Sequence, residues 1–344
     1  MGVEYLYLKK LPKVDLHRHL DGSLRVETIY ELAKEQNYKL PVDSVEELKN
    51  YVQVPENCNS LAEFLAKFET FYPLLEKPEA MERIAYEVSE DAYKDNVKYC
   101  ELRFAPVLQA KGGHSMEEIL DAVLRGLEKA HREFGIINPL ILCCYRSEPP
   151  ETSLETVKLA IKYRDRGIVG VDLAGDEEHF PAEIHKEAFQ LAYENNLHIT
   201  VHAGEVGAPS NMKEAVEILH ADRIGHGIRL VEDEKLLQEF VDKKIPLEVC
   251  PTSNVHTNAV KSYEEHPLNK LLEAGVKVTI NTDDPGISNI TMSDELNVLQ
   301  EKFNLDIEKI KELIFNGIDS SFTTDERKEK LRKEFKEEIE KLGI

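Results

Sequence analysis

A short apolar run followed by a polar, helix-forming stretch recurs along the chain, and this alternation limits the fold more than any other feature. Several runs are continuously apolar, which is typical of parallel strands buried on both faces. We predict strands at 14–16, 99–104, 140–144, 168–173, 198–201, 223–224, 246–250 and 276–280. Polar stretches with spaced Leu, Ile and Val, such as 116–134, predict helices between them. The pattern favours right-handed crossovers and a parallel sheet.

Eight strand–helix units predict an α/β protein of the (β/α)8 TIM barrel class, with a doubly wound open sheet as the alternative. The chain has 344 residues, and a barrel of about 250 residues with insertions fits this length as one domain. We therefore expect residues 1–344 to form a single catalytic barrel. Residues 325–344 are rich in Lys and Glu, with apolar residues at helical spacing, and predict a solvated terminal helix without a catalytic part.

The interval between the first two predicted strands is too long for one crossover helix, so we expect a helical insertion at about 40–80. Within it, an apolar stripe recurs at i, i+3, i+4 and i+7, which is one face of a helix. The stripe consists of Leu61, Phe64, Leu65 and Phe68. An insertion after the first strand lies at the rim of a barrel where active sites are found. The stripe is therefore either ordinary core or the inner face of a lid over an apolar ligand.

The charge balance argues against several classes of partner. Lys and Arg number 43 and Asp and Glu number 65, so the formal net charge is −22. This charge repels phosphate backbones and anionic lipids at long range, so we expect neither nucleic acid nor a membrane as a partner. No run reaches the ~18 apolar residues of a membrane span, and the first residues lack the pattern of a secretory signal. No obligate protein partner is indicated.

The five cysteines are scattered and include no CxxC pair. Such a set is typical of reduced thiols in a cytoplasmic protein and does not indicate a cysteine zinc site.

Titratable side chains follow the predicted strands directly, and on a barrel these positions converge on one rim. The extended segment His17-x-His19 projects both imidazoles to the same side, because strand side chains alternate with period two. Such a pair alone is more often two ordinary histidines, but His202 and Asp283 end other strands. Three imidazoles and one carboxylate suit zinc, with a bound water completing a catalytic site.

Four further side chains each allow a structural and a functional interpretation. Asp283 and Asp284, before Pro285, are either turn residues or carboxylates that divide metal and substrate between them. Glu205 is either a helix-terminal carboxylate or, in a closed cleft, an acid of raised pKa. His226 lies between two glycines and is either a packed core residue or a functional one.

Seven segments, taken in order, resemble adenosine deaminase. They are LHRHLDGS at 16–23, SLAEFLAKF at 60–68, DLAGDE at 172–177, HAGEVG at 202–207, RIGHG at 223–227, CPTSNV at 250–255 and NTDDPG at 281–286. Each motif alone is weak, but the ordered set is specific and covers nearly the whole chain. The resemblance implies a zinc-containing (β/α)8 barrel that deaminates adenosine and 2′-deoxyadenosine hydrolytically, to inosine or deoxyinosine and ammonia, in purine salvage.

The resemblance also implies roles for the matching residues. One zinc ion per chain would be bound by His17, His19, His202 and Asp283. Glu205 matches the proton donor to purine N1, His226 the histidine that orients the zinc-bound water, and Asp284 the carboxylate at N7. The bound water attacks C6, and ammonia leaves.

The remaining matches concern substrate binding. The backbone N–H of Gly175 matches the donor to N3, and Asp21, with His19 nearby, matches the group that receives the ribose 5′-hydroxyl. The apolar lid of the family matches Leu61, Phe64, Leu65 and Phe68. His256 falls in a stretch that varies among relatives, and we expect it in a solvated loop.

Three alternatives remain at this point. The substrate could be another 6-aminopurine, namely adenine, aminodeoxyfutalosine or an N6-substituted AMP, although a 5′-phosphate would meet the carboxylate of Asp21. The chain could be a different barrel metallohydrolase, or a non-catalytic purine-binding protein. A zinc site of the cytidine deaminase type is not indicated, because the PCxxC pair is absent.

Overall fold

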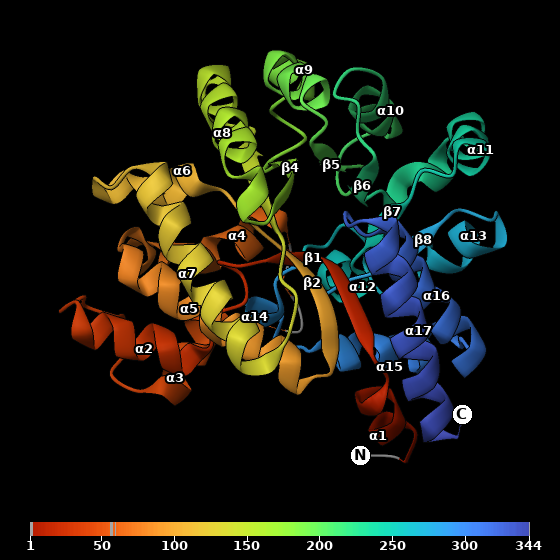
Figure 1. Cartoon of the computed structure of the whole chain (residues 1–344), viewed down its shortest axis with the longest axis horizontal. Coiled ribbons are helices and arrows are strands. Elements are labelled where there is room, and N and C mark those ends of the chain that lie inside the picture. The colour runs from red at the N-terminus through yellow and green to blue at the C-terminus, as the bar shows by residue number, and fades with distance from the viewer. Residues whose placement is uncertain (1–2, 56–57, 59, 344) are drawn as a thin grey trace.

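The computed structural model describes residues 3–55, 58 and 60–343. Within this part of the chain, eight parallel strands form one sheet in the order β1 to β8, surrounded by helices (Figure 1). The strands are β1 (Lys13–His19), β2 (Val97–Phe104), β3 (Leu140–Tyr145), β4 (Ile168–Ala174), β5 (His198–Ala203), β6 (Arg223–His226), β7 (Leu247–Val249) and β8 (Val278–Ile280). Each predicted strand is present, with ends that differ by a few residues.

The sheet closes because the segment after β8 returns to β1. Arg18 and Asp283 form a parallel bridge. The Asp283 N–H donates to the carbonyl of His17, and the His19 N–H donates to the carbonyl of Asp283, both at 2.8 Å. The predicted TIM barrel is confirmed, and the open-sheet alternative is wrong.

Helices cover the outside of the barrel and connect its strands. They are α1 (Val3–Lys10), α6 (Pro106–Gln109), α7 (Met116–Phe134), α8 (Pro150–Lys162), α9 (Lys186–Glu194), α10 (Pro209–Glu217), α11 (Glu234–Lys243), α12 (Pro251–His256), α13 (Leu268–Glu273), α14 (Pro285–Ser288), α15 (Met292–Phe303), α16 (Ile307–Ser320) and α17 (Asp325–Leu342). Local sequence sets their ends: Ser115 and Glu118 form a capping box at the start of α7, and Gly135, with φ of 73°, ends it.

The expected helical insertion lies between β1 and β2. It contains α2 (Val26–Glu35), α3 (Val45–Val52), α4 (Leu61–Glu69), the 3-10 helix η1 (Tyr72–Glu76) and α5 (Pro78–Lys94). The Ser60 hydroxyl caps α4 by accepting from the N–H of Glu63. Phe64 and Phe68 of α4 are buried, whereas Leu65 is 36% exposed. The apolar stripe is therefore only partly core.

The terminal helix α17 starts at Asp325, as predicted, but it is not solvated on all sides. Its apolar residues Leu331, Phe335 and Ile339 are buried against the rest of the protein.

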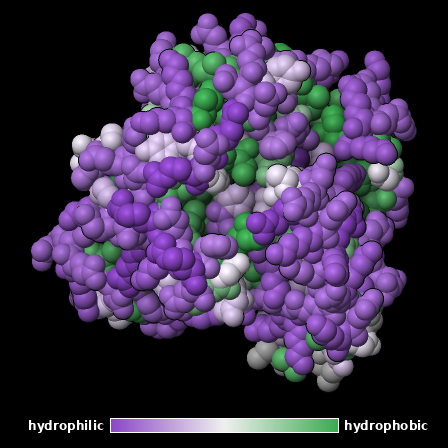
Figure 2. Space-filling view, viewed as in Figure 1, coloured by the Kyte–Doolittle hydropathy of each residue, from purple (hydrophilic) through white to green (hydrophobic). Residues whose placement is uncertain are grey.

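The face of the molecule in Figure 2 is largely hydrophilic, and apolar residues gather towards its centre and between the helices at the top. In the described part of the chain, no helix has the length and apolar character that a membrane crossing requires. The five cysteines are all buried and free, as expected.

Charged side chains occupy the barrel interior beneath the strand ends. Arg223 contacts Glu248 and Glu101, each at 2.6 Å, and its guanidinium lies 3.5 Å from the ring centre of Phe322. Arg103 contacts the second oxygen of Glu248 at 2.9 Å. All four charged residues are at most 1% exposed. Because buried charges are costly without partners, each member of this cluster depends on the others.

Replacing Arg223 with methionine leaves Glu101 and Glu248 without their shared cation, so we expect a loss of about 3–5 kcal/mol in the free energy of unfolding. Arg125→Met is the matched control, because Arg125 pairs with Glu82 at the surface, where a pair contributes about 1 kcal/mol or less. Urea unfolding followed by circular dichroism measures both. Equal losses in the two variants would contradict the assigned role of the buried cluster.

Candidate metal centre and active site

A cavity opens at the carboxyl ends of the strands, where barrel enzymes place their active sites. It encloses about 690 Å³, including its opening to solvent, a size typical of small-molecule sites. Every site residue predicted from the sequence lines this cavity except His17, which is fully buried beside His202 with ring centres 4.5 Å apart. The sequence motifs thus converge on one place.

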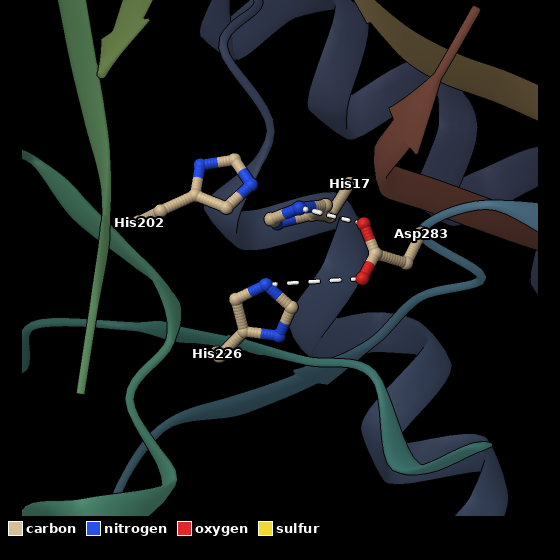
Figure 3. A group of neighbouring side chains, drawn as sticks. All are labelled: His17, His202, His226 and Asp283. Carbon is tan, nitrogen blue, oxygen red and sulfur yellow. Dashed lines mark ion pairs between the residues drawn. The ribbon is translucent and has the colours of Figure 1, made fainter. Parts of the chain in front are cut away.

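A cluster of metal-ligating atoms lies at the inner end of the cavity (Figure 3). One ligand atom from each of His17, His202, His226 and Asp283 lies within 4.8 Å of the others, and all four residues are buried. The two oxygens of Asp283 face different histidines: Oδ1 is 3.2 Å from Nε2 of His17, and Oδ2 is 3.8 Å from Nε2 of His226. The Nε2 atom of His17 has no hydrogen-bond partner in the described residues.

His19 adds a further nitrogen to the same space. Its Nε2 lies 3.2 Å from Nε2 of His202 and 3.4 Å from Oδ1 of Asp283. Zinc–nitrogen bonds of about 2.0–2.1 Å in a tetrahedron place neighbouring ligand atoms about 3.3 Å apart. Three donor pairs have about this spacing: His17–Asp283 at 3.2 Å, His19–His202 at 3.2 Å and His19–Asp283 at 3.4 Å. Nε2 of His226 lies somewhat farther from Asp283, at 3.8 Å from Oδ2.

Buried carboxylates contact two of these imidazoles at Nδ1, the ring nitrogen that points away from the cluster. Nδ1 of His17 lies 2.8 Å from Glu248, and Nδ1 of His202 lies 3.0 Å from Asp172. Each contact turns Nε2 towards the cluster, as second ligand-sphere carboxylates do in metalloproteins. Burial lowers the pKa of His202 to about 4, so its imidazole is neutral at pH 7, the form that binds metal.

Backbone conformation at the site is unusual. His226 and Asp283 have φ of 60° and 61°, in the left-handed region that non-glycine residues rarely adopt. Such strained positions persist where the surroundings fix them, and they are common at functional sites. Here the bridge to β1 fixes Asp283, and the Gly227 N–H bonded to Ala203 fixes the turn after His226.

Glu205 projects into the cavity from the loop after β5. Its Oε2 lies 3.7 Å from Nε2 of His226, and the Thr257 hydroxyl donates to its Oε1 at 2.9 Å. Burial raises the pKa of Glu205, and the nearby carboxylates of Asp283 and Glu177 raise it further. The environment of Glu205 therefore favours the protonated form of its carboxyl group.

Glu177, which the sequence did not single out, shapes the loop that presents Glu205. Its carboxylate is 5% exposed. It accepts hydrogen bonds from the N–H groups of Gly204, Val206 and Gly207, at 2.9, 2.7 and 2.5 Å. Backbone N–H groups on both sides of Glu205 are thus fixed by one buried side chain.

Asp284 lies beside the metal cluster with one oxygen unused. Its Oδ1 is buried without a hydrogen-bond partner among the described residues. A Cβ on Gly22 would lie only 1.6 Å from this atom, so the close approach requires glycine. Burial and the neighbouring carboxylates of Asp283 and Asp21 raise the pKa of Asp284 well above its ordinary value. A protonated Asp284 could donate a hydrogen bond into the cavity.

Asp21, two residues after His19, lines the cavity together with the apolar stripe of α4. Asp21 is 4% exposed, and its Oδ2 accepts from the Tyr72 hydroxyl at 2.9 Å and from Nε2 of Gln109 at 3.2 Å. Burial raises its pKa. Tyr72 and Gln109 were missed in the sequence because no local pattern links them to Asp21.

One sequence expectation is wrong. His256 does not lie in a solvated loop: it is the last residue of α12, is half-buried, and its Nδ1 lies 3.1 Å from the Ser288 hydroxyl. It does not line the cavity, whereas its neighbour Thr257 does.

Comparisons with known proteins agree with these features. The sequence model of a family described as adenosine deaminase matches residues 12–338. An adenosine deaminase from Clostridium acetobutylicum is 45% identical over 323 residues, covering 94% of this chain and 96% of that protein.

Solved structures with a similar fold include purine deaminases and an amidohydrolase. An adenine deaminase from Arthrobacter aurescens has a TM-score of 0.88 at 29% identity, covering 96% of this chain and 99% of its own. The N6-methyl-AMP deaminase from Arabidopsis thaliana has a TM-score of 0.86 at 32% identity, covering 97% and 98%. An amidohydrolase from Burkholderia ambifaria with bound zinc has a TM-score of 0.89 at 26% identity, covering 100% and 94%.

Removing the His202 imidazole should abolish or greatly weaken metal binding, because His202 belongs to the group of side chains that could hold a metal ion. We expect purified His202→Ala to contain far less than one metal ion per chain by mass spectrometric metal analysis. His179→Ala is the control, since His179 is exposed and pairs only with Asp176 among the residues described. Full metal occupancy in His202→Ala would remove His202 from the ligand set.

Proposed function

The chain belongs to the adenosine deaminase family, which makes it a hydrolase acting on a C–N bond, and we propose that it deaminates adenosine and 2′-deoxyadenosine in purine salvage. The products would be inosine or deoxyinosine, and ammonia. The observation that favours a neutral nucleoside is the charge of the cavity. Among the described residues that line it there are carboxylates but neither lysine nor arginine.

We propose one zinc ion per chain, bound by His17, His19, His202 and Asp283. The support is the donor set and the spacing of the donor pairs, which is near a tetrahedral edge. When bound, zinc supplies a water molecule of lowered pKa as nucleophile. His226 faces both Glu205 and Asp283 through Nε2, at 3.7 and 3.8 Å, and in this proposal it would orient that water.

The catalytic acid in this proposal is Glu205, which donates its proton to purine N1. Protonation of N1 lets the ring lose aromaticity without forming a full anion, and a positioned acid of this kind contributes about 10²–10⁴-fold. Thr257 orients the carboxyl group through the hydrogen bond at Oε1. Burial raises the pKa of Glu205, which favours the protonated form that this role requires.

The purine is oriented by two further groups. Asp284, with its raised pKa and partnerless Oδ1, donates to N7, which is an acceptor. The Gly175 N–H donates to N3; Gly175 lines the cavity with φ of 101°, and a Cβ there would lie 3.3 Å from the Tyr145 ring. The ribose 5′-hydroxyl donates to Asp21, beside His19.

The stripe of α4 forms the lid over the nucleoside in this proposal. Its four apolar side chains all line the cavity, and Leu65 remains 36% exposed without ligand. A partly exposed apolar side chain at the mouth gains burial when an apolar base enters. We further propose that the whole chain acts as one catalytic domain in the cytoplasm, with no obligate protein partner.

Among the described residues that line the cavity, there is no lysine or arginine to bind a 5′-phosphate. Arg18 and Arg25 do not line it: Nε of Arg18 donates to Ser23, and Arg25 pairs with Glu90 and Asp91. A phosphate would instead approach Asp21, and two anions repel strongly where little water screens them. Adenosine should therefore be preferred over AMP.

Glu205→Gln should keep the fold and the metal but lose at least about 10²-fold in kcat, because glutamine can donate to N1 without transferring a proton. In wild type, kcat/KM should hold through neutral pH and fall as pH rises through the raised pKa of Glu205. The variant should lack that dependence. Glu217→Gln, on the exposed part of α10, is the control. Near-normal turnover by Glu205→Gln would show that another group supplies the proton.

Wild type should prefer adenosine over 5′-deoxyadenosine by about 10- to 150-fold, because a hydrogen bond to a charged acceptor contributes about 1.5–3 kcal/mol. Asp21→Ala should lower adenosine turnover and narrow this gap. The measurement is kcat/KM on adenosine, 2′-deoxyadenosine, 5′-deoxyadenosine, adenine, AMP and aminodeoxyfutalosine, followed by ultraviolet absorbance. Faster turnover of AMP or adenine than of adenosine would leave a purine deaminase but remove the ribose-binding role of Asp21.

A further inference from the structure

The carboxylate of Asp21 is held by neutral donors alone. Tyr72, in η1, and Gln109, at the end of α6, both donate to Oδ2, although they lie on segments separated by α5 and β2. No lysine or arginine of the described chain lies within ion-pair distance of Asp21. Both side-chain donors act on Oδ2, and a backbone N–H also hydrogen-bonds the carboxyl group.

Gln109 is expected to lower the stability of the fold at its buried position. It is 1% exposed, and its Oε1 is buried without a partner in the part of the chain that the structure describes. An unsatisfied buried acceptor lowers stability, so an apolar side chain of similar size would suit the fold better. Within the described residues, the one hydrogen bond that the Gln109 side chain donates goes to Asp21. The position therefore points to a role in the site rather than in folding.

Tyr72 connects Asp21 to the lid. Its ring packs edge-on against Phe68 of α4, with ring centres 5.3 Å apart, and Phe68 contacts Phe64 at 6.3 Å. Tyr72 itself lines the cavity beside Asp21. The Tyr72 hydroxyl thus donates a hydrogen bond to Asp21, and the Tyr72 ring packs against the apolar stripe of α4.

We propose that Tyr72 and Gln109 are positioning residues that set specificity at the 5′ end of the nucleoside, by holding Asp21 as a fixed hydrogen-bond acceptor. Without their two donated hydrogen bonds, the buried carboxyl group of Asp21 would no longer be held in one orientation and could turn away from the ligand. It would then no longer distinguish a 5′-hydroxyl from a 5′-methyl group. This inference rests on the proposed deamination of adenosine and on the role of Asp21 within it.

The test compares kcat/KM for adenosine and for 5′-deoxyadenosine in Tyr72→Phe and Gln109→Leu. We expect each substitution to lower the ratio of the two by about 3- to 10-fold, chiefly through adenosine, since 5′-deoxyadenosine has no hydroxyl to lose. In an Asp21→Ala background, Tyr72→Phe should leave the ratio unchanged. Tyr145→Phe is the matched control: Tyr145 lines the same cavity, but no hydrogen bond joins it to Asp21 within the described residues. It should affect both substrates by the same factor.

Stability gives a second readout. Gln109→Leu should unfold at the same or a higher urea concentration than wild type while its substrate ratio falls. A ratio that stays at the wild-type value in Tyr72→Phe and Gln109→Leu, while Asp21→Ala lowers it, would overturn this inference and leave the proposed function intact. No preference for adenosine in wild type would instead refute the ribose-binding role of Asp21 on which the inference rests.

Discussion

The bridge between β1 and the segment after β8 is the interaction on which the site depends. The backbone of Asp283 bonds to His17 and His19 on both sides, and this pairing closes the barrel. The same residue then directs its two carboxylate oxygens at three histidines from two strands, His17 and His19 of β1 and His226 of β6. Closure of the sheet and assembly of the ligand cluster are therefore one event, and a barrel that failed to close would have no metal centre.

Beneath the cluster, buried charges couple the barrel interior to the ligands. Glu248 contacts Arg103, Arg223 and His17, so one carboxylate both pairs the interior cations and orients an imidazole. Arg103 also reaches Asp172, which orients His202. Apolar packing alone would give a more ordinary barrel core. Here the buried carboxylates Glu248 and Asp172 hold the imidazoles of His17 and His202 in fixed orientations.

The sequence predicted the strands and the convergence of the site, because both depend on local patterns: apolar runs and the residues directly after them. It did not predict Glu177, Thr257 or Tyr72, whose partners lie far away in sequence and only become neighbours once the barrel closes. The error at His256 has the same origin. A polar stretch resembled a loop, but Pro251 starts a short helix there and Ser288 from a later segment binds its end.

The cavity lining that the structure describes contains no lysine or arginine, and the chain as a whole is strongly negative, so charge should affect how fast different substrates bind. The chain has a net charge of −22, so its field neither attracts nor repels an uncharged nucleoside, and association should be nearly independent of ionic strength. A nucleotide would face a long-range barrier that shrinks as salt shortens the Debye length. Discrimination against anions thus begins outside the cavity, before any contact with Asp21 is made, and it is strongest in dilute solution.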